Sequence, residues 1–130
     1  MLRGFITALA ILRGTIRDCS PAESLATIQS MGINPVTPKP GDNSTIWVAY
    51  DLPAEITGGT VTYTYSLNYI PFQPTTVDLC VQEACPLAIG SHNASGSSSF
   101  PDVSGRLEGK IEWHDQNGNP IWCVDTVYSV

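Results

Sequence analysis

Charged residues are scarce in this chain, and basic residues are scarcer still. Asp, Glu, Lys and Arg make up 14% of its 130 residues, the only lysines are Lys39 and Lys110, and the formal net charge is −6. Average proteins carry about a quarter charged residues. Binding to nucleic acid needs basic groups that release counterions from the phosphates, so we expect no nucleic-acid partner. The same shortage predicts weak attraction to anionic membranes.

Long apolar runs and long helical patterns are also missing. The apolar run from Gly4 to Leu12 is too short to cross a bilayer. Turn-forming residues recur about every eight to twelve positions, which is typical of an all-β domain. The length suits one domain with a two-layer core.

Groups that could carry out catalysis are few and scattered. His92 and His114 are the two histidines, and neither lies in a nucleophile motif or at metal-ligand spacing. Glu108 and Glu112 alternate along one strand, which favours a solvated sheet face over an acid–base pair. We therefore predict no enzymatic activity, no metal and no cofactor.

What is present is a strong strand signal. From Thr60 to Tyr69 every second residue is apolar or aromatic, the period of a β-strand. Asn117-Gly118 predicts a hairpin turn. We expect further strands at 13–19, 25–33, 45–52, 106–114 and 121–128, with a weak, Ser-rich one at 89–100. About seven antiparallel strands predict an immunoglobulin-like β-sandwich.

The aromatic stripe of this strand permits two interpretations. Tyr63, Tyr65, Tyr69 and the nearby Phe72 could pack into a filled core, or they could line a gap between two sheets. An apolar gap would hold an apolar guest without catalytic groups.

The four cysteines, Cys19, Cys80, Cys85 and Cys123, could pair in three ways. We favour disulfides over metal ligation, because a zinc site needs about four suitably spaced ligands. Disulfides indicate an oxidising compartment. The glycosylation sequons at Asn43 and Asn93 agree with it.

The N-terminus has some features of a signal peptide. An apolar run follows Arg3, and Ala8-Leu9-Ala10 has the small-x-small form of a cleavage site. We interpret residues 1–12 as a short or truncated signal segment and residues 13–130 as the mature domain. The alternatives are ordinary mature sequence or a gene model that begins late.

The order of short motifs resembles the ML (lipid-recognition) domain family over about residues 13 to 130. That family includes Niemann–Pick type C sterol carriers and phosphatidylglycerol/phosphatidylinositol transfer proteins. The motifs are, in order, Asp18-Cys19, Ile70-Pro71-Phe72, Asp78-Leu79-Cys80, Cys85-Pro86-Leu87, Glu112-Trp113 and Trp122-Cys123.

The resemblance implies a seven-stranded sandwich whose sheets separate to admit a lipid. It implies pairing of Cys19 with Cys123 and of Cys80 with Cys85. It also places Phe72 at the pocket mouth and Val103 near a second pocket position. To these, the alternation of the strands adds Tyr63, Tyr65, Leu67, Ile111 and Trp113 as candidate lining residues.

The expected function is therefore lipid binding and transfer between membranes, with a phospholipid or sterol in an apolar cavity between the sheets. We expect a monomer that contacts membranes transiently, either secreted or in an endolysosomal or vacuolar lumen. The alternative is an extracellular immunoglobulin-like recognition module with a filled core. A cavity of a few hundred Å³ would favour the carrier.

Overall fold

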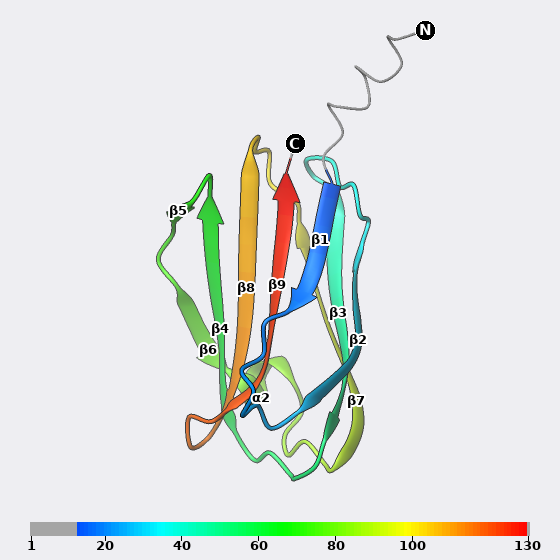
Figure 1. Cartoon of the computed structure of the whole chain (residues 1–130), viewed down its shortest axis with the longest axis vertical. Helices are drawn as coiled ribbons and strands as arrows, with labels where there is room; N and C mark the ends of the chain where they lie inside the picture. Colours follow the sequence, from blue (N-terminus) through cyan, green and yellow to red (C-terminus); the bar gives the residue numbers. More distant parts are fainter. Residues whose placement is uncertain (1–12, 130) are drawn as a thin grey trace, which may run out of the picture.

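The protein folds into two antiparallel β-sheets, shown in Figure 1 as a computed structural model. Residues 13–129 are described, and the predicted signal segment 1–12 lies outside them. The strands are β1 (Arg13–Asp18), β2 (Thr27–Asn34), β3 (Asn43–Leu52), β4 (Gly59–Leu67), β5 (Ile70–Pro71), β6 (Thr75–Asp78), β7 (Gly90–Ser99), β8 (Arg106–Asp115) and β9 (Pro120–Ser129).

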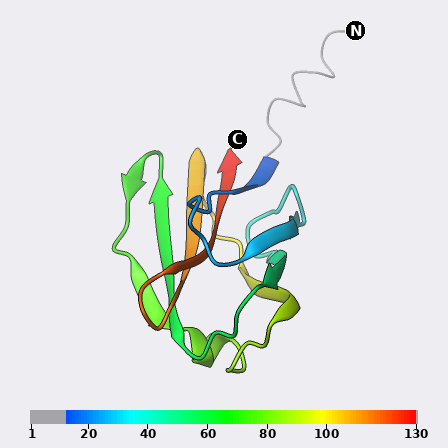
Figure 2. The same cartoon turned by 60° about the horizontal axis from the view of Figure 1, so that its bottom comes forward.

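The larger sheet has the order β1-β9-β8-β4-β5, with β6 also pairing with β4, and the smaller sheet has the order β2-β3-β7. Figure 2, turned by 60°, shows the two sheets as separate layers. The predicted all-β sandwich is therefore confirmed. It has nine strands rather than about seven, because the short β5 and β6 occupy the proline-containing segment after β4.

The core lies between the sheets and follows from alternation along the strands. On β3, every second residue from Ser44 to Leu52 faces inward, and Val48, Tyr50 and Leu52 are at most 2% exposed. The facing sheet contributes Val61, Trp113, Trp122 and Val124 to the same apolar cluster.

Two disulfides hold the fold together. Cys19 and Cys123 join the segment after β1 to β9, with Cα atoms 4.9 Å apart. Cys80 and Cys85 close a small loop around α2, a helix that spans Leu79–Gln82. Both pairings implied by the resemblance are present.

The strongest predicted strand ends earlier than its pattern suggests. β4 stops at Leu67, because Asn68 and Tyr69 adopt positive φ angles of 51° and 69°. Two consecutive positive φ values form the tight turn that joins β4 to β5. Tyr69 therefore leaves the stripe and is 76% exposed.

β7 is a more regular strand than its sequence predicts. The segment was expected to be a weak strand, yet Gly90–Ser99 forms ten residues of strand paired with β3 along its whole length. Backbone pairing with a long neighbour outweighs the low strand propensity of Ser and Gly.

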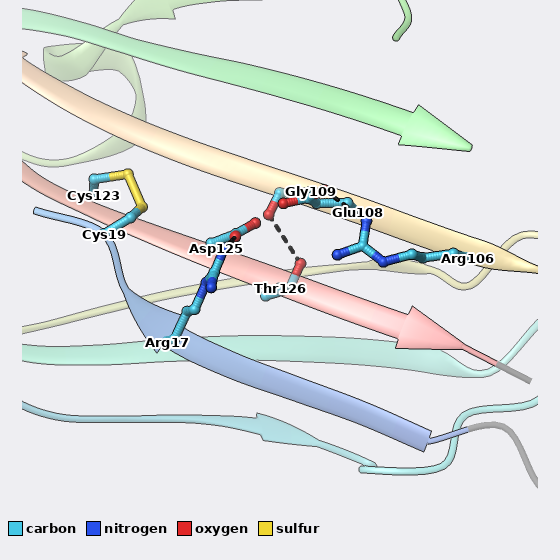
Figure 3. A network of polar contacts seen from close by, with 8 residues as sticks. All are labelled: Arg17, Cys19, Arg106, Glu108, Gly109, Cys123, Asp125 and Thr126. Atoms are coloured by element: carbon cyan, nitrogen blue, oxygen red, sulfur yellow. Dashed lines mark hydrogen bonds and ion pairs between the residues drawn. A yellow bond between two sulfur atoms is a disulfide. The ribbon is translucent and has the colours of Figure 1, made fainter. Parts of the chain in front are cut away.

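The outer face of the larger sheet carries a charged network (Figure 3). The guanidinium of Arg17 contacts the Asp125 carboxylate, and Arg106 pairs with Glu108 at 2.9 Å. Burial raises the pKa of Asp125, while the hydrogen bond from Arg106 lowers the pKa of Glu108. Glu108 was expected on a solvated face; it lies on the outer face with 28% of its side chain exposed, and it belongs to this network.

No helix among residues 13–129 is long and apolar enough to span a bilayer.

Candidate functional site

A cavity of about 690 Å³ lies between the two sheets. That volume falls within the range of about 300–1,000 Å³ that is usual for small-molecule sites. Both sheets contribute to its walls, and so do two edge strands, β6 and β7. The cavity is therefore a feature of the sandwich as a whole, not of one loop.

The interior of the cavity is largely apolar. The rings of Trp113 and Trp122 stack with centroids 4.4 Å apart and form part of the lining. Ile46 and Ala94 of the smaller sheet lie among the residues lining it, together with Ile111 of β8. Such side chains favour the transfer of hydrocarbon out of water.

Two aromatic residues of the lining are also open to solvent. Tyr65 is 44% exposed and Phe72 is 52% exposed. The Phe72 backbone N–H donates to the Tyr65 carbonyl at 2.8 Å, which joins their segments. The Tyr65 ring lies over Gly109, where an added Cβ would come within 3.1 Å of it. The absence of a side chain at Gly109 therefore lets Tyr65 lie flat against β8.

One wall of the cavity is polar. Gln82 and Glu83 reach it from the loop closed by the Cys80–Cys85 bridge. The Tyr63 hydroxyl donates to the Gln82 side-chain carbonyl at 3.0 Å. β7 also contributes to the lining, where Ser98 shares the inward face of the strand with Ala94 and Gly96.

Burial governs the ionisation of the groups near this polar wall. It raises the pKa of the Glu83 carboxyl, and nearby His92 partly offsets the shift. Burial also raises the pKa of Tyr63 and Tyr65. At neutral pH, the lining thus combines tyrosine and serine hydroxyls with a single ionisable carboxyl group.

The structure brings five of the seven predicted lining residues together around this cavity: Tyr63, Tyr65, Phe72, Ile111 and Trp113. Leu67 and Val103 do not line it. Leu67 lies at the end of β4, where the chain turns into β5. Val103 lies in the connection between β7 and β8, where its N–H donates to the Pro101 carbonyl.

Sequence reasoning missed several residues of the lining. Gln82 and Glu83 gave no local signal, because their place in the wall depends on how the disulfide loop folds against the sheets. The Ser-rich segment gave no such signal either, since its composition is that of a surface loop. The other residues missed include Ser44, Ile46, Leu107, Trp122, Thr126 and Tyr128.

The sequon asparagines lie on the opposite face of the smaller sheet. Asn43 and Asn93 are exposed, whereas their neighbours Ser44 and Ala94 line the cavity. Because side chains alternate between the two faces of a strand, both asparagines point away from the cavity. Glycans at these positions would leave its interior free.

The chain matches the family model described as "ML domain" over residues 14–130. It belongs to the ML domain family. A Dictyostelium discoideum protein, provisionally named a phosphatidylglycerol/phosphatidylinositol transfer protein, is 28% identical over 113 residues. That match covers 83% of this chain and 80% of its relative.

Two solved structures share the fold. A Niemann–Pick type C2 protein from the Japanese carpenter ant superimposes with a TM-score of 0.64 at 14% identity, covering 87% of this chain and 96% of that one. Chicken MD-1 complexed with lipid IVa superimposes with a TM-score of 0.68 at 12% identity, covering 91% and 89%. At such low identity these likenesses establish the sandwich fold of this ML domain and nothing finer.

Proposed function

We propose that this ML-domain protein binds a lipid in the cavity between its sheets and carries it between membranes. The observation that carries the proposal is the apolar cavity of about 690 Å³. Moving hydrocarbon from water into such a space yields about 0.8 kcal/mol per buried CH₂ group. A filled core, which the alternative of an immunoglobulin-like recognition module requires, would leave no space of this size.

The relatives support the same class of ligand. The solved structure of chicken MD-1 contains lipid IVa, and the name of the Dictyostelium relative refers to phospholipid transfer. Both proteins align with most of this chain, so the lipid in the MD-1 structure and the name of the Dictyostelium relative support a lipid ligand for this chain.

Exposed apolar side chains beside the cavity suit contact with a membrane. Tyr69 and Ile70 are 76% and 67% exposed, and they precede Phe72, which lines the cavity. Since basic residues are scarce, insertion of these side chains, rather than charge attraction, would hold the protein briefly at the lipid surface. The protein would act there as a monomer, and it would change the location of the lipid without making or breaking bonds.

The disulfides suit a secreted or lumenal carrier. The bridge between Cys19 and Cys123 spans a sequence separation of 104 residues, and such links persist in oxidising compartments.

Lipid extraction followed by mass spectrometry tests the proposal. The protein is purified from a eukaryotic secretory host, checked for folding by circular dichroism, and extracted with organic solvent. We expect a stoichiometric lipid, or uptake of a labelled lipid from vesicles by protein that carries none. Folded protein that neither contains nor takes up any lipid would refute the proposed function.

A further inference from the structure

The lining of the cavity carries charge of one sign only. Among the described residues that line it, Glu83 is the one with a formal charge at neutral pH, and none is Lys, Arg or His. Protein sites that recognise phosphate groups ordinarily supply cationic donors. This cavity offers hydroxyl groups and a carboxylate instead.

The guanidinium groups of Arg106 and Arg17 are paired outside the cavity. Arg106 pairs with Glu108 and stacks on the Tyr69 ring, 4.7 Å from its centroid. Arg17 pairs with Asp125 on the outer face of the larger sheet. Neither guanidinium belongs to the lining of the cavity.

Glu83 is held firmly in its position. Its backbone N–H donates to the Leu79 carbonyl at 2.8 Å, and Leu79 is fully buried. The Cys80–Cys85 bridge closes the loop on both sides of Glu83. The backbone at Glu83 is therefore fixed beside the cavity, which keeps its carboxyl group within reach of an incoming ligand.

We propose that Glu83 is a specificity-determining residue that selects against lipids with a net negative head group. The inference rests on the proposed function and deepens it. A phosphate brought near Glu83 would place two like charges in a partly desolvated space, where electrostatic repulsion is stronger than in water. A lipid with an uncharged, hydroxyl-bearing head group would instead meet the hydroxyls of Tyr63 and of Ser98, which lies on the inward face of β7.

The proposal sets this chain apart from its Dictyostelium relative, whose name refers to two anionic phospholipids. The two proteins share 28% identity over the aligned region. A difference in one charged wall residue is compatible with a common fold and a common cavity.

Two labelled lipids with the same acyl chains test the proposal: diacylglycerol, which is uncharged, and phosphatidylglycerol, which is anionic. We expect the wild-type protein to bind diacylglycerol about tenfold more tightly at pH 7. The variant Glu83→Gln should bring the two affinities close together. The control Glu112→Gln removes the same charge from the opposite face of β8 and should leave their ratio unchanged.

The pH dependence of the wild-type protein tests the same idea without a substitution. The groups facing Glu83 are His92 on β7, Tyr50 on β3 and Tyr63 on β4. Burial raises the pKa of Glu83, so its charge is lost at a higher pH than for a free glutamate. We expect discrimination against phosphatidylglycerol to shrink as the pH falls through that range, while the lipid phosphate stays ionised.

The outcomes separate the two proposals. If the wild-type protein binds neither lipid, the proposed function fails and this inference fails with it. If it binds both lipids equally at pH 7, or if neither Glu83→Gln nor acidification changes the ratio, the role of Glu83 is overturned while the lipid carrier remains.

Discussion

The Nη2 atom of Arg17 lies 2.7 Å from the Oδ2 atom of Asp125, which joins β1 to β9. The two side chains differ sharply in exposure: 71% for Arg17 and 2% for Asp125. The second carboxylate oxygen of Asp125, Oδ1, is buried without a hydrogen-bond partner in the described part of the chain. Arg17 thus compensates a carboxylate that is otherwise poorly solvated.

Replacing Arg17 by Gln should destabilise the protein by roughly 1–2 kcal/mol at pH 7, because it leaves a buried carboxylate poorly paired. Asp125 already has a raised pKa. Its contribution to stability is therefore greatest below its unfolded-state pKa of about 3.9, and that contribution is lost as the pH rises through the folded-state value. Once Asp125 is protonated it needs no cation, so the loss caused by Arg17→Gln should shrink toward pH 4.

Urea unfolding at several pH values measures this effect. Lys39→Gln is the matched control, since it removes the same charge from an exposed loop residue. An equal loss of stability at pH 7 and pH 4 would show that the effect of Arg17→Gln does not depend on the ionisation of Asp125.

The sequence predicted the sandwich and five residues of the cavity lining, and the reasons differ from residue to residue. Tyr63, Ile111 and Trp113 were found because alternation assigns a side chain to one face of a sheet. Alternation does not reveal where a strand ends, so Leu67 was included although it lies beyond the cavity.

Residues brought in by tertiary structure were harder to foresee. Glu83 enters the wall only because a disulfide loop folds against the sheets, and Ser95 enters because β7 pairs with β3. The burial of Asp125 depends on β1 lying beside β9, a pairing between opposite ends of the chain. Local patterns do not record such long-range contacts.

The two disulfides should contribute unequally to stability. In the chain-entropy model, a bridge that closes about a hundred residues contributes about 4.7 kcal/mol, and a much shorter loop contributes less. The Cys19–Cys123 bridge has a sequence separation of 104 residues, against 5 for Cys80–Cys85. Replacing both cysteines of the long bridge by Ser should therefore lower the midpoint of unfolding more than replacing those of the short one.

Equilibrium unfolding in denaturant of the two double variants measures that difference. Loss of the short bridge should instead affect lipid selectivity, because it frees the loop that holds Glu83. A larger loss of stability from Cys80→Ser/Cys85→Ser than from Cys19→Ser/Cys123→Ser would contradict this ranking.

The exposed side chains beside the cavity should affect the rate of lipid transfer between membranes more than they affect the affinity of the protein for lipid. Ile70 is 67% exposed and does not line the cavity. The variant Ile70→Ser should slow transfer of a labelled lipid between vesicles several-fold, because less apolar surface enters the membrane. Its affinity for a lipid monomer should stay within about twofold of wild type.

Val81 provides the control for that experiment. It is 79% exposed and also lies outside the lining of the cavity. It belongs to α2, which Figure 1 shows at the opposite end of the molecule from the β4–β5 turn. If Val81→Ser slows transfer as much as Ile70→Ser, exposed apolar area in general, rather than this segment, controls membrane contact.

Gly96 offers a way to fill the cavity without disturbing the fold. It lies on β7 opposite Ile46 and lines the cavity, and a Cβ added there would meet no atom within 4 Å. Its φ lies outside the range that L-residues avoid. We expect Gly96→Leu to fold normally and to lower lipid affinity more than tenfold, because the new side chain occupies space that the hydrocarbon needs.

The matched control is Asn93→Leu on the same strand, which adds the same side chain at an exposed position facing away from the cavity. Both proteins are expressed without glycosylation, so that loss of the Asn93 sequon has no effect. Binding of a labelled lipid is titrated by fluorescence, and circular dichroism checks the fold. If Gly96→Leu folds and still binds the lipid as tightly as Asn93→Leu, the ligand does not occupy the space between the sheets, and the carrier mechanism must be abandoned.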